Sequence, residues 1–113
     1  MNDRELLEMA ARTAGIESLG YSQNGIVVDM SDPCFIGYWN PLSDDGDALR
    51  LAVMLSMSVF AGGLRCVSVS AWITCATFAA PINLTEQYVG DDKYAATRRA
   101  IVRAAAEIGQ RPE

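Results

Sequence analysis

Apolar residues recur at intervals of three and four near the start of the chain, and this spacing predicts a helix from Asp3 to Ala14. Asn2 is suited to cap its first turn, and Gly15 is suited to end it in a left-handed conformation. The residues expected to face the core are Leu6, Leu7, Ala10, Ala11 and Ala14.

An alternating pattern follows and predicts a hairpin. Asn24 and Gly25 favour a tight turn, and the segment from Ile26 to Met30 alternates with the period of a half-buried strand. Ser31-Asp32-Pro33 interrupts this strand, and residues 35–39 are expected to form a short extended piece.

The helical period returns from Ser43 to about Leu55. Pro41 disfavours helix at the residue before it, so Ser43 is the expected cap. Negative charge is favourable at this end of a helix, and three aspartates fall in the first turn: Asp44, Asp45 and Asp47. The residues expected to be buried are Ala48, Leu51, Ala52 and Leu55.

Three more strands are expected, at residues 57–60, 65–75 and 82–88. In the second of these, apolar residues alternate with serine and threonine, which indicates an antiparallel sheet with one dry face. Because that stretch is long for one strand, we expect a bend near Ala71 or Thr74.

A last helix is predicted from Asp92 to Ile108, with Gly109 as its stop. Its expected inward stripe consists of Tyr94, Ile101, Ala105 and Ile108. Clustered strands and scattered helices favour an α+β fold over a parallel sheet. We therefore expect three helices and an antiparallel sheet of about four to five strands, in a single domain over residues 1–113.

The charges are unevenly distributed along the chain. Fourteen acidic residues against nine basic ones give a net charge of −5, which disfavours direct binding of nucleic acid through its phosphates. Residues 29–49 hold five carboxylates and no Lys or Arg, whereas residues 93–103 hold four of the nine basic residues. The preferred interpretation is two ordinary solvated surfaces, and the alternative is a charged docking surface for a partner.

Several function classes are disfavoured by the residue types that the chain carries. It has no histidine, which is the usual general base near neutral pH and the commonest transition-metal ligand. Cys34, Cys66 and Cys75 lack a paired spacing, so they are expected to be reduced packing residues. No catalytic residue, metal or cofactor is expected. No apolar run has the length of a bilayer span and no basic, apolar leader opens the chain, so we expect a cytoplasmic protein without a membrane partner.

The aspartate clusters invite a metal site as an alternative. The run Asp44-Asp45-Gly46-Asp47 does not match the alternating oxygens and late glutamate of a calcium loop. Helix capping is the preferred interpretation of this run and of Asp91-Asp92. A magnesium site built from both clusters remains an alternative without positive support.

Two blocks of the sequence resemble a known family. They are Trp39-Asn40-Pro41-Leu42-Ser43-Asp44-Asp45-Gly46-Asp47-Ala48-Leu49-Arg50-Leu51-Ala52-Val53 and Tyr88-Val89-Gly90-Asp91-Asp92-Lys93-Tyr94-Ala95-Ala96-Thr97-Arg98-Arg99-Ala100-Ile101. Both resemble the small bacteriophage and prophage proteins of the phage α/β/α-sandwich family. The resemblance implies helices on both faces of the sheet and a viral origin, and it implies no activity and no catalytic residue.

Two functional hypotheses follow from different classes. The first is a phage accessory protein that binds a host protein or protein complex, such as a defence complex, by imitating phosphate charge; its candidate residues are Asp29, Asp32, Tyr38, Trp39, Asp44, Asp45 and Asp47. Within this set, the preferred interpretation of Trp39 is a core plug, with a recognition surface as the alternative. The second hypothesis is a protein that sequesters a nucleotide-like anion with Arg98, Arg99 and Arg103.

Overall fold

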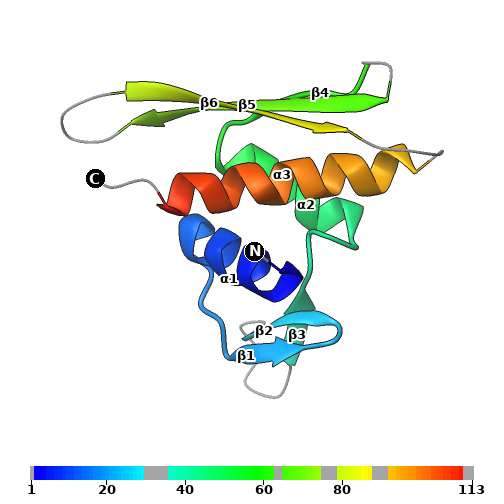
Figure 1. The fold of residues 1–113 in the computed structure, drawn as a ribbon. Coiled ribbons are helices and arrows are strands. Elements are labelled where there is room, and N and C mark those ends of the chain that lie inside the picture. Colours follow the sequence, from blue (N-terminus) through cyan, green and yellow to red (C-terminus); the bar gives the residue numbers. More distant parts are fainter. Residues whose placement is uncertain (1, 30–35, 63–64, 75–78, 88–91, 111–113) are drawn as a thin grey trace.

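Three helices lie between two three-stranded antiparallel sheets in the computed structural model of the chain (Figure 1). The structure describes residues 2–29, 36–62, 65–74, 79–87 and 92–110. The helices are α1 (Asp3–Ala14), α2 (Asp45–Met54) and α3 (Lys93–Gln110). The strands are β1 (Gly20–Ser22), β2 (Gly25–Asp29), β3 (Ile36–Trp39), β4 (Ser58–Phe60), β5 (Cys66–Thr74) and β6 (Ala79–Gln87).

Helix α3 is the centre of the fold. It packs against α1, α2, β5 and β6, and so it contributes more fully buried residues than any other described helix: Ala96, Ala100, Ile101, Val102, Ala104, Ala105 and Ala106. Small alanine side chains on several sides of one helix allow neighbours to approach closely. Residues 104–106 are three consecutive alanines, and all three are buried.

The larger sheet has the order β4-β5-β6 and covers one side of α3. Val67, Val69 and Ala71 of β5 are buried against the helices, while Ser68 and Ser70 between them are half-buried on the opposite face. This is the dry and wet alternation that the sequence predicted. Of the two positions where a bend was expected, the pairing of β5 with β6 runs through Ala71 without a break, and β5 ends at the other, Thr74.

Strand β6 begins earlier than predicted. It starts at Ala79 and includes Pro81, which pairs with Trp72, whereas the sequence predicted a start at Ile82. Proline cannot donate to a strand ladder, but an edge strand has one side with no neighbour to bond. Because β6 is the last strand of this sheet in the described part of the chain, the proline is accommodated.

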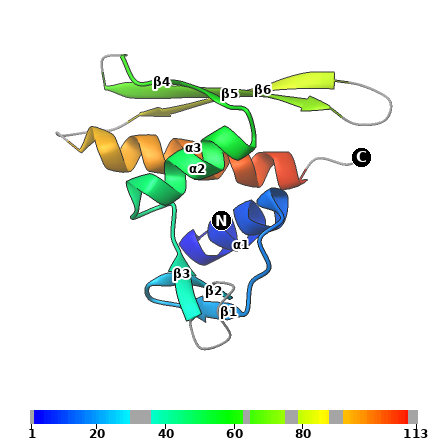
Figure 2. The same ribbon diagram turned by 180° about the vertical axis from the view of Figure 1, so that it is seen from behind.

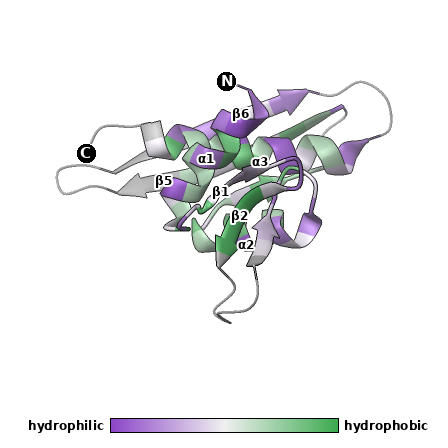
Figure 3. Cartoon of the chain, turned by 90° about the horizontal axis from the view of Figure 1, so that it is seen from below, coloured by the Kyte–Doolittle hydropathy of each residue, from purple (hydrophilic) through white to green (hydrophobic). Residues whose placement is uncertain are grey.

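The smaller sheet, β1-β2-β3, lies on the other side of the helical layer (Figures 1 and 2). The predicted hairpin is confirmed: Ser22 pairs with Gly25 around a two-residue turn. Gly25 has φ +116°, and a Cβ there would lie 2.6 Å from the Trp39 carbonyl oxygen, so only glycine fits. Strand β2 is strongly hydrophobic (Figure 3), and its Ile26 is fully buried beneath the helices.

The α+β class is confirmed, but the prediction of one sheet of four to five strands is wrong. The strands form two separate sheets, and the helices lie between them instead of on both faces of one sheet (Figures 1 and 2). Helix α2 separates the two groups of strands in the sequence and in space. Alternation identifies strands locally, whereas the pairing of strands depends on long-range packing.

Two helices differ from the prediction at one terminus each: α2 at its start and α3 at its end. The cap of α2 is Asp44 and not Ser43, because the Ser43 and Asp44 amides donate to the Asn40 carbonyl (3.1 and 2.9 Å) and close a turn before the helix starts. Helix α3 continues through its predicted stop, Gly109, to Gln110. Tyr94, expected in the inward stripe of α3, is 72% exposed.

Other local predictions hold. Helix α1 has the predicted bounds, the Asn2 side chain accepts from the Glu5 amide (2.8 Å), and Gly15 ends the helix at φ +75°. Trp39 is buried in the core with 8% of its surface exposed, which confirms the plug interpretation. Cys66 is a half-buried free thiol, and Cys34 and Cys75 lie outside the described residues.

Candidate functional site

A groove of about 490 Å³ opens between α2, the first turns of α3 and the strand β4. Its floor is made of apolar residues, three of which are alanines: Ala48 and Ala52 from α2, Ala61 after β4, and Ile101 from α3. We call this feature the α2–α3 groove. Its volume is within the range of ordinary ligand pockets, and its lining is predominantly apolar, as such sites usually are.

The walls of the groove carry apolar side chains that the fold leaves uncovered. Leu49 of α2 is 64% exposed, Val59 of β4 is 40% exposed, and Tyr94 of α3 is 72% exposed. Val53, one turn after Leu49 on the same side of α2, extends the apolar surface and is 71% exposed. Such concentrations of exposed apolar residues mark interaction sites in soluble proteins.

Strand β4 borders the groove through Val59, and Ala61 just after the strand also belongs to the lining. All three β4 residues are exposed, and in the described part of the chain β5 is its one strand neighbour. Val59 pairs with the buried Val69 and therefore lies on the face of the sheet that looks toward the helices. The free edge of β4 thus runs along the groove.

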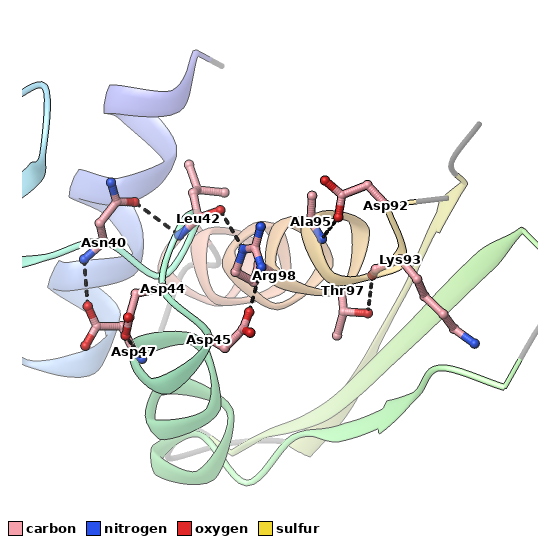
Figure 4. Close-up of polar contacts among 10 residues, drawn as sticks. All are labelled: Asn40, Leu42, Asp44, Asp45, Asp47, Asp92, Lys93, Ala95, Thr97 and Arg98. Carbon is pink, nitrogen blue, oxygen red and sulfur yellow. Dashed lines mark hydrogen bonds and ion pairs between the residues drawn. The ribbon is translucent and has the colours of Figure 1, made fainter. Parts of the chain in front are cut away.

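Polar groups occupy one end of the groove (Figure 4). Arg98 donates from Nε to the Leu42 carbonyl (2.9 Å) and from a terminal nitrogen to the Asp45 carboxylate (2.6 Å). Lys93, at the start of α3, points away from this pair and has no described partner for its ammonium group. Among the described residues, the lining therefore combines one ion pair, Arg98 with Asp45, and one cation for which no partner is described.

The three aspartates at the start of α2 are engaged in local structure (Figure 4). The Asp44 side chain accepts from the Asp47 amide (2.7 Å), which is the capping role that the sequence predicted for this cluster. The Asp47 carboxylate accepts from the Asn40 amide (3.0 Å) and from Arg50 (2.7 Å). Asp45 pairs with Arg98. These carboxylates hold the turn before α2 in place, while the side chains of Asp44 and Asp45 remain 59% and 69% exposed.

The other described residues of the predicted partner-binding set do not line the groove. Tyr38 is exposed on β3 in the smaller sheet, and Trp39 is buried in the core. Asp32 lies outside the described residues, and of Asp29 only the backbone, paired with Ile36, is described. Asp45 is the one described member of the set that lines the groove.

The three arginines of the anion-binding alternative point to three different elements. Arg98 pairs with Asp45 of α2, Arg99 pairs with Asp3 of α1 (2.9 Å), and Arg103 pairs with Glu86 of β6. Each cation already has its own carboxylate. Arg99 and Arg103 share a polar recess beside β6, but Glu86 and Glu107 line that recess as well. The arrangement therefore offers an incoming phosphate no uncompensated positive charge.

The sequence interpretation missed the main residues of the groove, which are Leu49, Val59, Lys93 and Tyr94. One signal for them was present. Residues 48–54 of α2 are apolar on nearly every side, with Arg50 as the one polar exception. A helix of that kind is either buried all round or keeps an uncovered face for another molecule.

Neither a metal centre nor a membrane-spanning helix is found among the described residues. No group of three or more His, Cys, Asp or Glu residues within them is placed to hold a metal ion. None of the three described helices combines the length and the apolar character that a bilayer crossing requires.

Comparisons of the chain with protein-family models, with curated proteins and with solved structures find no match. The interpretation of the site therefore depends on its own geometry.

Proposed function

We propose that this protein acts by binding a protein partner through the α2–α3 groove. The observation that carries the proposal is the gathering of uncovered apolar side chains at one place, on α2, β4 and the start of α3. The apolar surface continues past the pocket to Val53, farther than a compact small molecule would need. A protein segment uses such an extended surface, with large apolar residues as anchors at its centre.

As in the first hypothesis, the protein is a non-enzymatic binding protein. The proposed contact surface is now the apolar α2–α3 groove instead of the acidic segment. In a phage accessory protein, this groove would hold part of a host protein and block it. The acidic residues at the start of α2 then support the groove, because Asp45 fixes Arg98 and Asp47 fixes the turn at Asn40. Phosphate mimicry needs carboxylates that are free, and these are paired.

A pair of matched variants tests the proposal. Leu49→Ser alters the groove, whereas Leu19→Ser alters a leucine of similar exposure (55%) just before β1, outside the groove. Both leucines are exposed, so neither change should unfold the protein. Each variant and the parent protein are immobilised and used to capture proteins from a bacterial lysate, with captured proteins quantified by mass spectrometry.

We expect one captured protein to be retained by the parent and by Leu19→Ser, and to fall to about a tenth or less with Leu49→Ser, as is typical of a central apolar anchor. Equal capture by all three proteins, with circular dichroism showing that each is folded, would exclude the groove as the contact surface.

A further inference from the structure

We infer that the partner of the α2–α3 groove is an extended, acidic peptide segment that adds a strand to the free edge of β4. This inference rests on the proposed function and specifies its mode of recognition. In such strand addition, main-chain hydrogen bonds provide affinity, and pockets for alternate side chains provide specificity.

The edge of β4 is the first support. An edge strand presents unpaired N–H and C=O groups along its outer side. Proteins commonly protect such edges with charged residues, proline or a covering loop, whereas β4 consists of Ser58, Val59 and Phe60, all exposed. In the described part of the chain, no backbone hydrogen bond outside the β4–β5 pairing involves these three residues.

The position of the groove under this edge is the second support. Neighbouring strands lie about 4.8 Å apart, and side chains of a strand alternate between its two faces. A strand added beside β4 would therefore lie over the α2–α3 groove and direct every second side chain toward Leu49 and Ala52. The alanines of the floor leave room for those side chains.

Charge complementarity decides the chemistry of the segment. The groove lining holds one carboxylate, Asp45, and two cations, Arg98 and Lys93, in a chain whose net charge is −5. Asp45 neutralises Arg98, so the charge left for a ligand is the ammonium group of Lys93. A carboxylate on the incoming strand fits this position.

A second copy of this chain fits the same edge less well. The β4 strand of a second copy, Ser58-Val59-Phe60, carries no carboxylate that could pair with Lys93. A small organic anion would use Lys93 and the floor but would leave the β4 edge unpaired. The acidic peptide satisfies the edge, the floor and the cation together.

Selection from a random peptide library tests the inference. Ten-residue peptides are selected against the full chain, and synthetic copies of the enriched peptides are measured by fluorescence anisotropy. We expect apolar residues at every second position and one Asp or Glu. Lys93→Glu should weaken binding of these peptides about tenfold, whereas Arg12→Glu, an exposed charge reversal on α1, should not change it.

Backbone methylation separates strand addition from other binding modes. In an added strand, the amides of alternate residues point at β4, and those between point away. Methylating one alternate set should reduce affinity about tenfold or more, and methylating the other set should leave it unchanged. In NMR spectra, the amide signals of residues 58–60 should shift on binding.

The failures are distinguishable. Strand addition would be overturned by peptides whose apolar residues have helical spacing, or by peptides that keep their affinity when either set of amides is methylated. If such peptides lose affinity for Leu49→Ser, the groove remains the binding site. Peptides whose binding ignores Leu49→Ser would remove the proposed function as well. A protein that light scattering shows to be a dimer, with residues 58–60 at its interface, would assign the edge to a second copy and overturn the inference.

Discussion

Gly109 lets α1 and α3 touch near their C-terminal ends. A Cβ at this position would collide with Oγ1 of Thr13 and would lie 3.1 Å from the Met9 sulfur. The Thr13 hydroxyl donates to the carbonyls of Met9 (3.0 Å) and Ala105 (2.9 Å), so it has little freedom to move aside. Close packing therefore explains why glycine occupies a helical position that the sequence suggested was a stop.

We predict that Gly109→Ala lowers the free energy of unfolding. Overpacking a tight contact costs about 1–3 kcal/mol, which exceeds the gain of up to ~1 kcal/mol that alanine has over glycine inside a helix. Gly46→Ala is the control, because a Cβ there lies 3.2–3.3 Å from the Asp44 carboxylate and the Arg50 guanidinium, a contact that a shift of a few tenths of an ångström relieves. Urea unfolding should show a loss for Gly109→Ala and none for Gly46→Ala. Equal stability of both variants would contradict the packing explanation.

Arg98 joins α3 to the segment that leads into α2. Its side chain is 18% exposed and binds two groups 53 and 56 positions away, the Asp45 carboxylate and the Leu42 carbonyl. Arg99 also forms an ion pair, with Asp3, but both of those side chains are substantially exposed. Both arginines therefore form an ion pair with an aspartate, but the Arg98 side chain is more buried than that of Arg99.

We predict that Arg98→Ala destabilises the protein more than Arg99→Ala. Loss of a hydrogen bond to a charged group in a half-buried site costs roughly 1.5–3 kcal/mol, whereas an exposed ion pair contributes about 0–1 kcal/mol. Arg98→Lys should not restore the loss, because an ammonium group cannot reproduce the fork that binds both oxygens. Unfolding free energies of the three variants check this ranking, and equal effects of Arg98→Ala and Arg99→Ala would refute it.

The helices were largely predictable from the sequence, and the sheets were not. Helix α1 follows from a cap at Asn2, a 3.6-residue period and Gly15, all of which act within a few residues. Strand pairing depends on which buried surface each hairpin reaches. The alternation around Ile26 and around Val69 is alike in sequence, yet these strands belong to different sheets.

The candidate site was hidden for a related reason. The sequence shows an acidic segment and a basic one, which we assigned to two separate surfaces. Folding brings Asp45 and Arg98 together across 53 positions and cancels their charges. Periodicity correctly placed Leu51 in the core, but it could not show that Leu49, half a helical turn away, would line a groove together with β4 and α3.

The two sheets differ in how extensively their buried side chains pack against the helices. The larger sheet lies on α3, and its Val67 and Val69 are buried in the central core beside Val102. The smaller sheet reaches the helical layer mainly through two fully or nearly buried side chains, Ile26 and Trp39. Regions with fewer buried apolar contacts open at lower free energy than the rest of a protein.

We predict that the smaller sheet opens as a unit before α3 and β5 do. Native-state hydrogen exchange should give the amides of β2 and β3 a lower opening free energy than those of α3 and β5. Ile26→Val removes one buried methylene and should lower protection of β2 and β3 by about 0.5–1.5 kcal/mol, with little change in α3. Val67→Ala, in the central core, should lower protection throughout.

The α2–α3 groove lies on α2, α3 and β4, and none of its lining residues comes from the smaller sheet. Ile26→Val should therefore leave the affinity for a groove-binding peptide unchanged although it loosens β2 and β3, because opening of that sheet does not remove a binding residue. Loss of affinity in step with the loss of protection would show that the two halves are coupled through the turn at Asn40, where β3 passes into α2 and the Asp47 carboxylate accepts from the Asn40 amide.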